Sequence, residues 1–444
     1  MKALSVSLAV AAALVTQQAF SAGFIEDSNA TLGLRNFVYH NDIANRDDAP
    51  SAREWGQGFL FNYSSGYTRG PVGFGLDAVA LIGVKLDSGG DGGSPTDSRT
   101  PGALFPRESN GEAVDNYSKG GLTAKLRFSK TEARLGILQP KLPVVTFNDG
   151  RLLPQTFDGG QITSNEIENL TLTAGQLEST TTRSSTDSIG LRIAGAAAAN
   201  GIQADSNTFY FAGGDYKIGK DLLAQYYYGN LEDFYQQHFL GLTHTLALGD
   251  GSLKSDLRYF DSRSDGKNAS AAGRAQGYRS SGYWNGAAAN PDRFEVDNQT
   301  WSALFTYSQA GHSLGVGYQQ LSGSSAFPFL SQGDGATAYL ITDRQIGKFL
   351  SAGERTWLAE YGYDFAKLGV PGLKASVAYL KGDNVNRAGS DAEEWERDLR
   401  VDYTVQNGAL KGLGLSWRNA ILRGDVADDA KENRLIASYS IALL

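Results

Sequence analysis

The sequence predicts an all-β protein, an 18-stranded antiparallel transmembrane β-barrel with an inward-folded third loop. Three observations support this fold class. Short turns and longer loops alternate along the chain. One segment is longer than an ordinary globular strand and has one wholly apolar face. In the last segment, outward-facing and inward-facing residues alternate up to the final residue. The composition agrees, because 54 Gly, 21 Tyr and 21 Phe accompany a negative mean hydropathy.

The N-terminus has the three parts of a secretory signal peptide. Lys2 precedes an apolar run that ends at Val15, and the small residues Ser21 and Ala22 offer a cleavage site. We therefore expect residues 1–22 to be a signal peptide and residues 23–444 to form a single transmembrane β-barrel domain. A short buried helix at the start of a cytosolic domain is the alternative. Beyond this run, no apolar stretch approaches the roughly 18 residues of an α-helical span.

The clearest predicted strand runs from Val72 to Asp87. Its even-numbered positions are all apolar, whereas its odd-numbered positions include Asp77 and Lys85. The run exceeds the roughly 5–6 residues usual in globular proteins and suits a tilted membrane-spanning strand with its apolar face toward lipid. A long strand of a soluble sandwich or solenoid is the alternative.

The connections between predicted strands alternate in length. Short turns are predicted at Tyr67–Pro71, Ser129–Glu132, Glu178–Asp187, Lys217–Lys220, Gly249–Ser252, Gln309–His312, Lys367–Pro371 and Gln406–Lys411. Longer loops are predicted at Asn41–Arg53, Asp87–Lys119, Gln139–Glu166, Ala196–Asp205, Gly229–Asp233, Ser264–Arg293, Ser322–Glu354, Gly382–Glu393 and Gly424–Ala430. Eight turns and nine loops join eighteen strands, with both termini on the short-turn side, which is typical of bacterial outer-membrane barrels.

The last segment, Arg434–Leu444, predicts how the barrel closes. Leu435 and the alternate residues after it point outward, while Arg434 and its alternate partners point inward. We expect this strand to pair with Thr31–Tyr39. Such pairing removes the last open edge, which a membrane would not tolerate.

The stretch from Gly120 to Gln161 contains two predicted strands and then a loop of unusual composition. Three prolines and a glycine in Pro140–Phe157 prevent the strands from continuing, yet the segment is too apolar for an ordinary solvated loop. We expect this third loop to fold into the barrel and to present Asn148, Asp149 and Arg151 at the narrowest point of the pore. An outward, disordered loop is the alternative.

The lumen of an eighteen-stranded barrel is aqueous, so its lining should determine the function. The alternation places mostly basic charges inward, at Arg35, Lys125, Arg127, Arg134, Arg192, Lys254, Arg258, Arg400, Arg418 and Arg434. Arg35, Arg400, Arg418 and Arg434 lie on strands that become neighbours when the barrel closes. Because a guanidinium group holds a carboxylate bidentately, four adjacent arginines could pass an anion along the pore. Alternatively, they pair with lumenal acids and only stiffen the wall.

Several motifs resemble the OprD family of outer-membrane channels and recur in the order found there. They are GFIEDS at Gly23–Ser28, KTEARLGILQPKLPVVTFNDGRLLPQTFDGGQ at Lys130–Gln161, YYYGNLEDFYQQHF at Tyr226–Phe239, VDNQTWSA at Val296–Ala303, GHSLGVGYQ at Gly311–Gln319 and EWERDLRVDYTVQNGALKGLGLSWRNA at Glu394–Ala420. The resemblance implies an eighteen-stranded substrate-specific barrel in which a third loop narrows the pore and a ladder of basic residues guides carboxylates.

The resemblance also suggests roles for residues of this protein. Arg35, Arg400, Arg418 and Arg434 are at plausible ladder positions, with Lys125, Arg127 and Arg134 as further candidates, and Asn148, Asp149 and Arg151 lie in the matching third-loop motif. Two segments, PKLPVVTFNDGRLLPQTF at Pro140–Phe157 and GATAYLITDRQIGKFLSAGERTW at Gly335–Trp357, resemble the OccK-like branch, which takes cyclic and aromatic carboxylates, more than the branch that takes basic amino acids.

The sequence therefore predicts a passive channel of the Gram-negative outer membrane for small carboxylate-bearing solutes. A channel for basic amino acids or peptides, a general diffusion porin and, more remotely, an outer-membrane enzyme are the alternatives. Zero Cys and four His leave little for metal or acid–base chemistry, so we expect no cofactor, no metal and no catalysis. The expected partners are outer-membrane lipids and small anionic solutes, and the net charge of −8 argues against nucleic acid. A monomer and a weak homotrimer both remain open.

Overall fold

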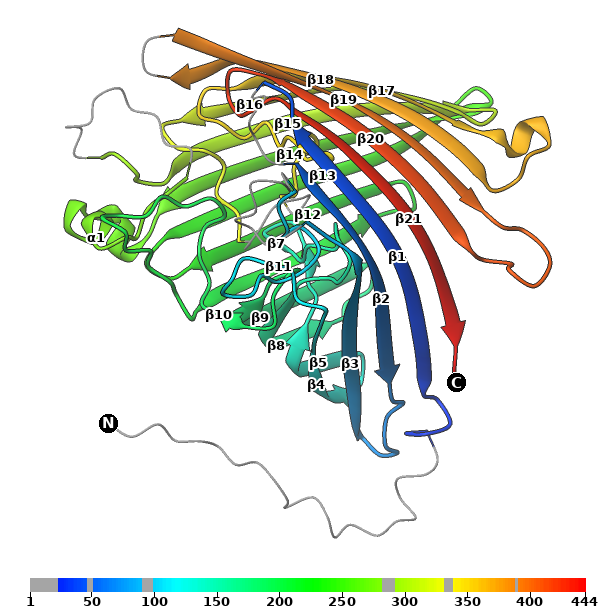
Figure 1. The fold of residues 1–444 in the computed structure, drawn as a ribbon. Coiled ribbons are helices and arrows are strands. Elements are labelled where there is room, and N and C mark those ends of the chain that lie inside the picture. The colour runs from blue at the N-terminus through cyan, green and yellow to red at the C-terminus, as the bar shows by residue number, and fades with distance from the viewer. Residues whose placement is uncertain (1–22, 46–50, 90–98, 282–291, 331–337, 388–389) are drawn as a thin grey trace, which may run out of the picture.

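The computed structural model describes residues 23–45, 51–89, 99–281, 292–330, 338–387 and 390–444. These residues form one large antiparallel sheet that closes on itself (Figure 1). The predicted signal peptide lies outside the described residues. Within the described part of the protein, no helix is long and apolar enough to cross a membrane.

Eighteen long strands build the wall of the barrel. They are β1 (Asn29–Ile43), β2 (Ala52–Ser64), β3 (Val72–Asp87), β4 (Asn116–Phe128), β5 (Thr131–Leu138), β8 (Thr156–Ser164), β9 (Leu170–Thr181), β11 (Phe209–Ile218), β12 (Leu222–Leu231), β13 (Tyr235–Leu248), β14 (Gly251–Ser264), β15 (Asp297–Gln309), β16 (His312–Gly323), β17 (Arg355–Asp364), β18 (Leu373–Arg387), β19 (Ser390–Thr404), β20 (Gly414–Gly424) and β21 (Ala430–Ala442). The connections carry short elements, namely β6 (Lys141–Leu142), β7 (Val145–Thr146), β10 (Ser188–Ile189), η1 (Gly266–Ala269), α1 (Ala271–Ala275) and η2 (Phe365–Leu368).

The barrel closes between its first and last strands, as the sequence predicts. β1 pairs antiparallel with β21, so that Arg35 lies opposite Ser438 and Tyr39 opposite Arg434. Figure 1 shows this seam where the blue β1 runs beside the red β21. The closed sheet has no free edge, so the backbone groups of every wall strand find partners on both sides.

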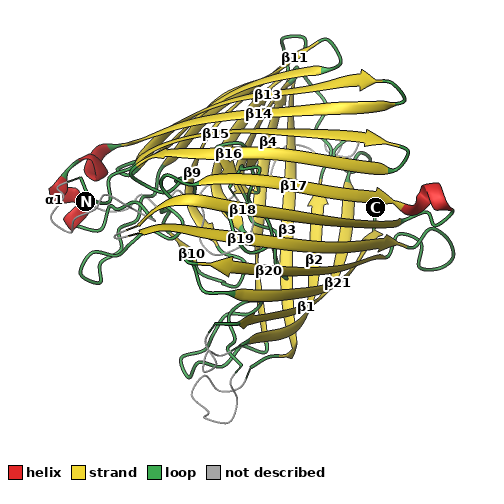
Figure 2. Cartoon of the chain, turned by 90° about the horizontal axis from the view of Figure 1, so that it is seen from above, coloured by secondary structure: helices red, strands yellow, loops and turns green. Residues whose placement is uncertain are grey.

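The two ends of the barrel differ. One end carries the C-terminus and the turn with η2, and the other carries α1 in the sixth loop (Figure 2). We number the connections at the second end in sequence order. Four of them are used below: L2 (residues 88–115), L3 (residues 139–155), L4 (residues 182–208) and L7 (residues 324–354).

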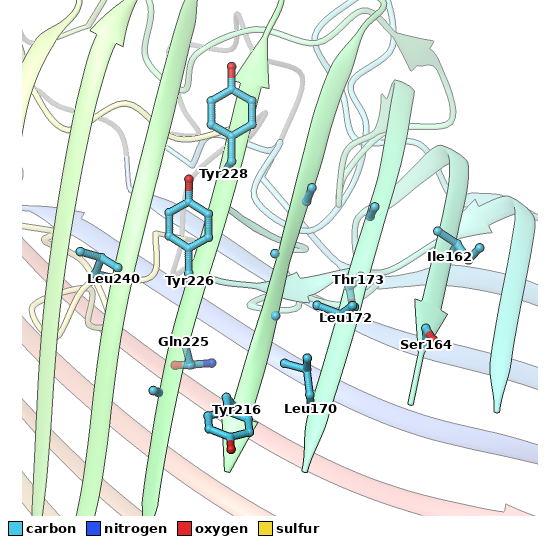
Figure 3. A pocket seen from close by; sticks show the side chains of 15 residues that line it. Ile162, Ser164, Leu170, Leu172, Thr173, Tyr216, Gln225, Tyr226, Tyr228 and Leu240 are labelled. Atoms are coloured by element: carbon cyan, nitrogen blue, oxygen red, sulfur yellow. The ribbon is translucent and has the colours of Figure 1, made fainter. Parts of the chain in front are cut away.

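The outer face of the wall is apolar. On β3, Phe74 and Ile82 at even-numbered positions are exposed, whereas Leu81 at an odd-numbered position is buried. This confirms the predicted orientation of the strand. This face has a hollow of about 720 Å³ lined by residues of β8, β9, β11, β12 and β13. Figure 3 shows the side chains that line it, among them Leu172, Tyr226 and Leu240. Since its rim side chains are exposed, the hollow belongs to the membrane-facing surface and not to the pore.

The inner face leaves room for loops. Gly56 and Gly58 lie on β2 where L3 crosses the wall, and a Cβ added to Gly56 would sit 2.8 Å from a methyl carbon of Leu152. Leu152 and Leu153 are completely buried there, in a cluster with Phe105 of L2. The predicted inward fold of the third loop is confirmed. The glycines explain it physically, because any larger side chain at Gly56 would collide with the loop.

The structure corrects the predicted strands after L3. The predicted turn at Glu178–Asp187 is wrong, because β9 continues to Thr181 and the polypeptide then enters L4. The predicted strand between that turn and Ala196 is also wrong, since only the two residues of β10 join the wall there, whereas Leu191 and Ile193 form isolated bridges to Ser206 of L4 and Leu330 of L7. The strand between β5 and β9 is β8, which was predicted as part of the loop Gln139–Glu166 because Asp158-Gly159-Gly160 has the composition of a loop. Gly159 is required there because an added Cβ would lie 2.2 Å from the Gln176 carbonyl oxygen.

One predicted loop is instead strand. The segment Gly382–Glu393 is predicted as a long connection, but β18 and β19 continue through most of it and pair Val385 with Ala392. Its Asp and Asn residues have the composition of a loop, yet the ladder extends past them with a bulge after Gly382. The predicted number of eighteen strands is still correct. The missed strand β8 and the wrongly predicted strand before Ala196 cancel in the count, and the error in the loop Gly382–Glu393 changes only the lengths of two strands.

Candidate pore constriction and arginine row

The tip of L3 is tied to the wall by Arg35. The two terminal nitrogens of its guanidinium group donate to the two carboxylate oxygens of Asp149, at 2.7 and 3.2 Å. The same group donates to the Arg151 carbonyl oxygen at 2.8 Å. A bidentate ion pair of this kind fixes both partners, so Arg35 holds the loop across the lumen.

The other two predicted loop residues point away from the open lumen. Asn148 is fully buried, and its side-chain oxygen accepts from the Gly150 backbone nitrogen at 2.9 Å. Arg151 is 2% exposed, and its guanidinium carbon lies 4.3 Å from the centre of the Tyr39 ring. Its Nη2 lies 3.6 Å from a carboxylate oxygen of Glu432 on β21. Of the three loop residues, only Asp149 is exposed.

This burial favours a scaffolding role for Arg151 over direct contact with a solute. We expect Arg151→Ala to raise the ion conductance and to weaken discrimination between solutes together, because the loop loses one of its wall contacts. The cost in folding free energy should be about 3 kcal/mol, since Glu432 loses one of its two cationic neighbours. Single-channel recording beside solute uptake checks this. A selective loss of acidic-solute uptake at unchanged conductance would contradict it.

Three arginines form a row on the inner wall. Arg400 of β19 lies opposite Arg418 of β20, and Arg418 lies opposite Arg434 of β21. Neighbouring strands are roughly 4.8 Å apart, so the guanidinium groups share one patch of the wall. The row then meets Tyr39 on β1, whereas Arg35 lies four positions further along that strand. We call Arg400, Arg418 and Arg434 the arginine row.

The three arginines of the row differ in their partners. Arg400 pairs with Asp402, and Arg434 pairs with the buried Glu432. Arg418 donates to the Ser416 hydroxyl at 3.2 Å and has no carboxylate partner within the described part of the protein. Arg418 is therefore flanked by two other cations and is the member of the row that forms no ion pair within the described residues.

L7 also folds into the pore, which sequence reasoning missed. Arg434 donates to the Gln345 carbonyl oxygen at 2.9 Å, and the buried Glu396 of β19 accepts from the backbone nitrogens of Ile346, at 3.0 Å, and Gly347. The apolar runs 326–330 and 338–341 are the signal that could have revealed this, because they resemble the composition of L3. L4 likewise buries Leu191 against the inner wall.

A cavity of about 700 Å³ remains between L3, L7 and the wall from β16 to β21. All three members of the arginine row line it, together with Asp149 and Gly150 of L3 and Tyr339 of L7. We call this space the L3–L7 cavity. Burial raises the pKa of the Tyr339 hydroxyl.

The remaining predicted basic residues lie elsewhere. Lys125 is buried and forms an ion pair with Asp77 at 2.7 Å, and the guanidinium carbon of Arg127 lies 4.1 Å from the centre of the Tyr67 ring. Arg134 pairs with Glu132 and lies opposite Lys125. These three residues gather near the turn between β4 and β5, at the opposite end of the barrel from L3, and all have partners.

Two other inward predictions have different outcomes. Arg192 lies in L4 and not on a wall strand, where it pairs with Asp205 at 3.0 Å. Arg258 does face inward from β14 and forms a bidentate pair with Asp256. Within the described residues, no group of His, Cys, Asp or Glu side chains could hold a metal ion.

Comparison with known proteins identifies the family. A family model described as outer membrane porin, OprD family, matches residues 22–443. The chain belongs to the OprD family of outer-membrane porins. This OprD-family porin is 35% identical over 436 residues to the porin-like protein GalP of Pseudomonas putida, and the match spans 98% of this sequence and 96% of that protein.

Solved structures agree with this assignment. OccK8 (OprE) of Pseudomonas aeruginosa is 56% identical, with a TM-score of 0.87, and the match covers 95% of this protein and 100% of that one. OpdK of the same organism, solved with vanillate, is 35% identical with a TM-score of 0.82 and the same coverage. The predicted barrel, family and outer-membrane location of this OprD-family porin are confirmed. Its family consists of channels and not of enzymes.

Proposed function

We propose that this outer-membrane porin is a passive, substrate-specific channel for small carboxylate-bearing solutes, with cyclic and aromatic acids favoured. The observation that carries the proposal is Arg418. It lines the L3–L7 cavity between Arg400 and Arg434, and it has no carboxylate partner in the part of the protein that the structure describes. A carboxylate entering the cavity completes the missing ion pair and recovers hydrogen bonds lost on leaving water.

The other basic residues support the proposal in different ways. Arg35 and Arg434 hold L3 and L7 close to Arg418, while Arg400 extends the positive surface along the wall. Arg400 is half exposed, so its pair with Asp402 is weak enough for a passing anion to exchange with it. Weak, repeated sites are what conduction requires, because a single tight site would trap the solute.

One solved relative supports the aromatic preference. The OpdK structure was obtained with vanillate, an aromatic acid. Outer-membrane lipids around the wall complete the proposal for the protein in its membrane, where it works either as a monomer or as a weak homotrimer. Passive transport is expected because the sequence contains no phosphate-binding loop.

Replacing Arg418 tests the proposal. We expect Arg418→Met, which keeps the apolar stem, to lower the anion-to-cation permeability ratio roughly fivefold and to slow benzoate uptake. The difference should shrink in 1 M salt, where the screening length falls to about 3 Å. Reversal potentials across a salt gradient and uptake into liposomes measure both effects.

Two controls frame this test. Arg400→Met should have a smaller effect, because Asp402 already offsets part of the charge of that arginine. Lys374→Met, on the turn side of β18, should have none. If Arg418→Met keeps the wild-type ion preference and benzoate uptake, the row stiffens the wall and the proposed function fails.

A further inference from the structure

Lys141 and Phe147 line the L3–L7 cavity from the L3 side, across from the wall that carries Arg418. β6 and β7 pair so that Lys141 lies opposite Thr146, the neighbour of Phe147. The Lys141 ammonium is 5.3 Å from the centre of the Phe147 ring. Lys141 is exposed and has no carboxylate partner among the residues that the structure describes. The cavity therefore holds a second cation without a counterion, next to an aromatic ring.

We infer that Lys141 and Phe147 form a second recognition point, and that the preferred solutes are aromatic acids that carry a second anionic group on the ring. The inference rests on the proposed function, because Arg418 takes the first carboxylate. The solute ring packs against Phe147, and the second anionic group meets Lys141. A solute with both groups satisfies two cations at once.

The dimensions suit such a solute. A sphere of the volume of this cavity is roughly 11 Å across, which accommodates one substituted benzene ring with its two charged groups. Phe147 is three residues from Gly150, whose carbonyl oxygen lies 3.4 Å from Nη1 of Arg434. Three residues span at most about 11 Å, so the ring of Phe147 cannot lie far from the arginine row.

A second aromatic side chain from L7 limits the space. Tyr339 lines the same cavity, with the Arg258 guanidinium carbon 4.1 Å from its ring centre and its carbonyl oxygen accepting from Arg258 at 3.1 Å. Its ring also packs edge-on against Phe239, with the centroids 5.6 Å apart. Tyr339 is therefore held in place, whereas the ammonium of the exposed Lys141 is carried by a flexible four-carbon stem and can adjust to the position of a solute.

Four carboxylates line the cavity as well. Asp149 and Glu360 are neutralised by Arg35 and Arg344, respectively, each at 2.7–2.8 Å. Asp343 accepts from the Ala338 backbone nitrogen at 2.7 Å, and Asp398 lies beside Glu396 on β19. If the last two were the second contact, the channel would favour a ring with a cationic substituent. The experiment must therefore compare both kinds of solute.

Uptake into liposomes containing the full-length barrel tests the inference with four solutes: benzoate, terephthalate, para-aminomethylbenzoate and hexanoate. Wild type should take up terephthalate in preference to the other three. Lys141→Met should lower the terephthalate-to-benzoate ratio roughly fivefold, and Lys141→Arg should restore most of it. Phe147→Leu should lower the benzoate-to-hexanoate ratio about threefold. Lys220→Met, in the short turn before β12, is the matched control and should change neither ratio.

The outcomes separate this inference from the proposed function. If Lys141→Met leaves the terephthalate-to-benzoate ratio unchanged while Arg418→Met still slows benzoate, the second recognition point does not exist but the carboxylate channel does. If wild type prefers para-aminomethylbenzoate to terephthalate, Asp343 and Asp398 provide the second contact and the inference is overturned. If neither Lys141→Met nor Arg418→Met changes the uptake of any of the carboxylates, both proposals fail.

Discussion

Deleting residues 144–155 should raise the single-channel conductance roughly threefold and remove most discrimination between solutes. The segment includes Val144, Leu152 and Leu153, which bury their side chains on the inner wall, and Asp149, which reaches across to Arg35. The remaining residues 139–143 can connect β5 to β8 as a short hairpin loop. The backbone hydrogen bonds between β5 and β8 are unchanged, so the barrel should still form.

A second variant controls for loop length. Replacing residues 144–155 by a Gly/Ser linker of equal length keeps the number of residues but removes the apolar side chains of this segment that are buried on the wall. Its conductance should rise nearly as much as that of the deletion, because a flexible polar linker has no reason to stay against the wall. Unchanged conductance in both folded variants would mean that L3 does not set the bore, and that L4 and L7 constrict the pore without it.

Replacing Arg434 by Leu should loosen two loops at once. Its Nη1 reaches the Gly150 carbonyl oxygen of L3 and its Nη2 that of Gln345 in L7, while Nε binds Glu432. Removing the cation also leaves the buried Glu432 with Arg151 alone, so the free energy of unfolding should fall by about 3 kcal/mol. We expect larger and noisier currents in single-channel recordings, and a lower unfolding midpoint in denaturant.

Two companion variants separate the loop contacts from the buried charge. Arg434→Leu combined with Glu432→Gln removes the buried charge that Arg434 helped to neutralise and keeps an acceptor for the Tyr39 hydroxyl, so part of the lost stability should return while the currents stay noisy. Arg434→Lys keeps the charge, but its single ammonium group cannot reach the carbonyl groups of Gly150 and Gln345 and the Glu432 carboxylate at once. We therefore expect a current between those of the wild type and Arg434→Leu. Quiet, wild-type currents in all three variants would show that the loops are held by their apolar contacts alone.

The barrel could be predicted because its signals are local. Alternation along Val72–Asp87 reports which face meets lipid, and turn residues report where strands reverse. The errors in the strand assignment arose where a strand has the composition of a turn or loop. Asp158-Gly159-Gly160 has the composition of a turn, yet Gly159 is in a strand because the neighbouring backbone comes too close for a side chain.

The candidate site could be predicted only in part. Alternation placed Arg35, Arg400, Arg418 and Arg434 on the inner face, and proline with apolar residues marked L3 as an inward loop. L7 carries the same kind of apolar run but lies inside a connection of thirty-one residues, residues 324–354, whose path no local pattern specifies. Lys141 was missed because the L3–L7 cavity that it lines is completed by L7 and by strands β16 to β21, which lie far away in the sequence.

The sequence by itself determined that this protein is an eighteen-stranded outer-membrane barrel with an arginine-rich lumen and a third loop inside it. Only the tertiary structure decided what each charge does. Arg434 and Arg151 share the buried Glu432, Arg35 holds Asp149, and Arg418 alone in the row forms no ion pair among the described residues. Period-two alternation specifies the direction of a side chain, but its partner depends on strand register and on how the loops pack inside the barrel.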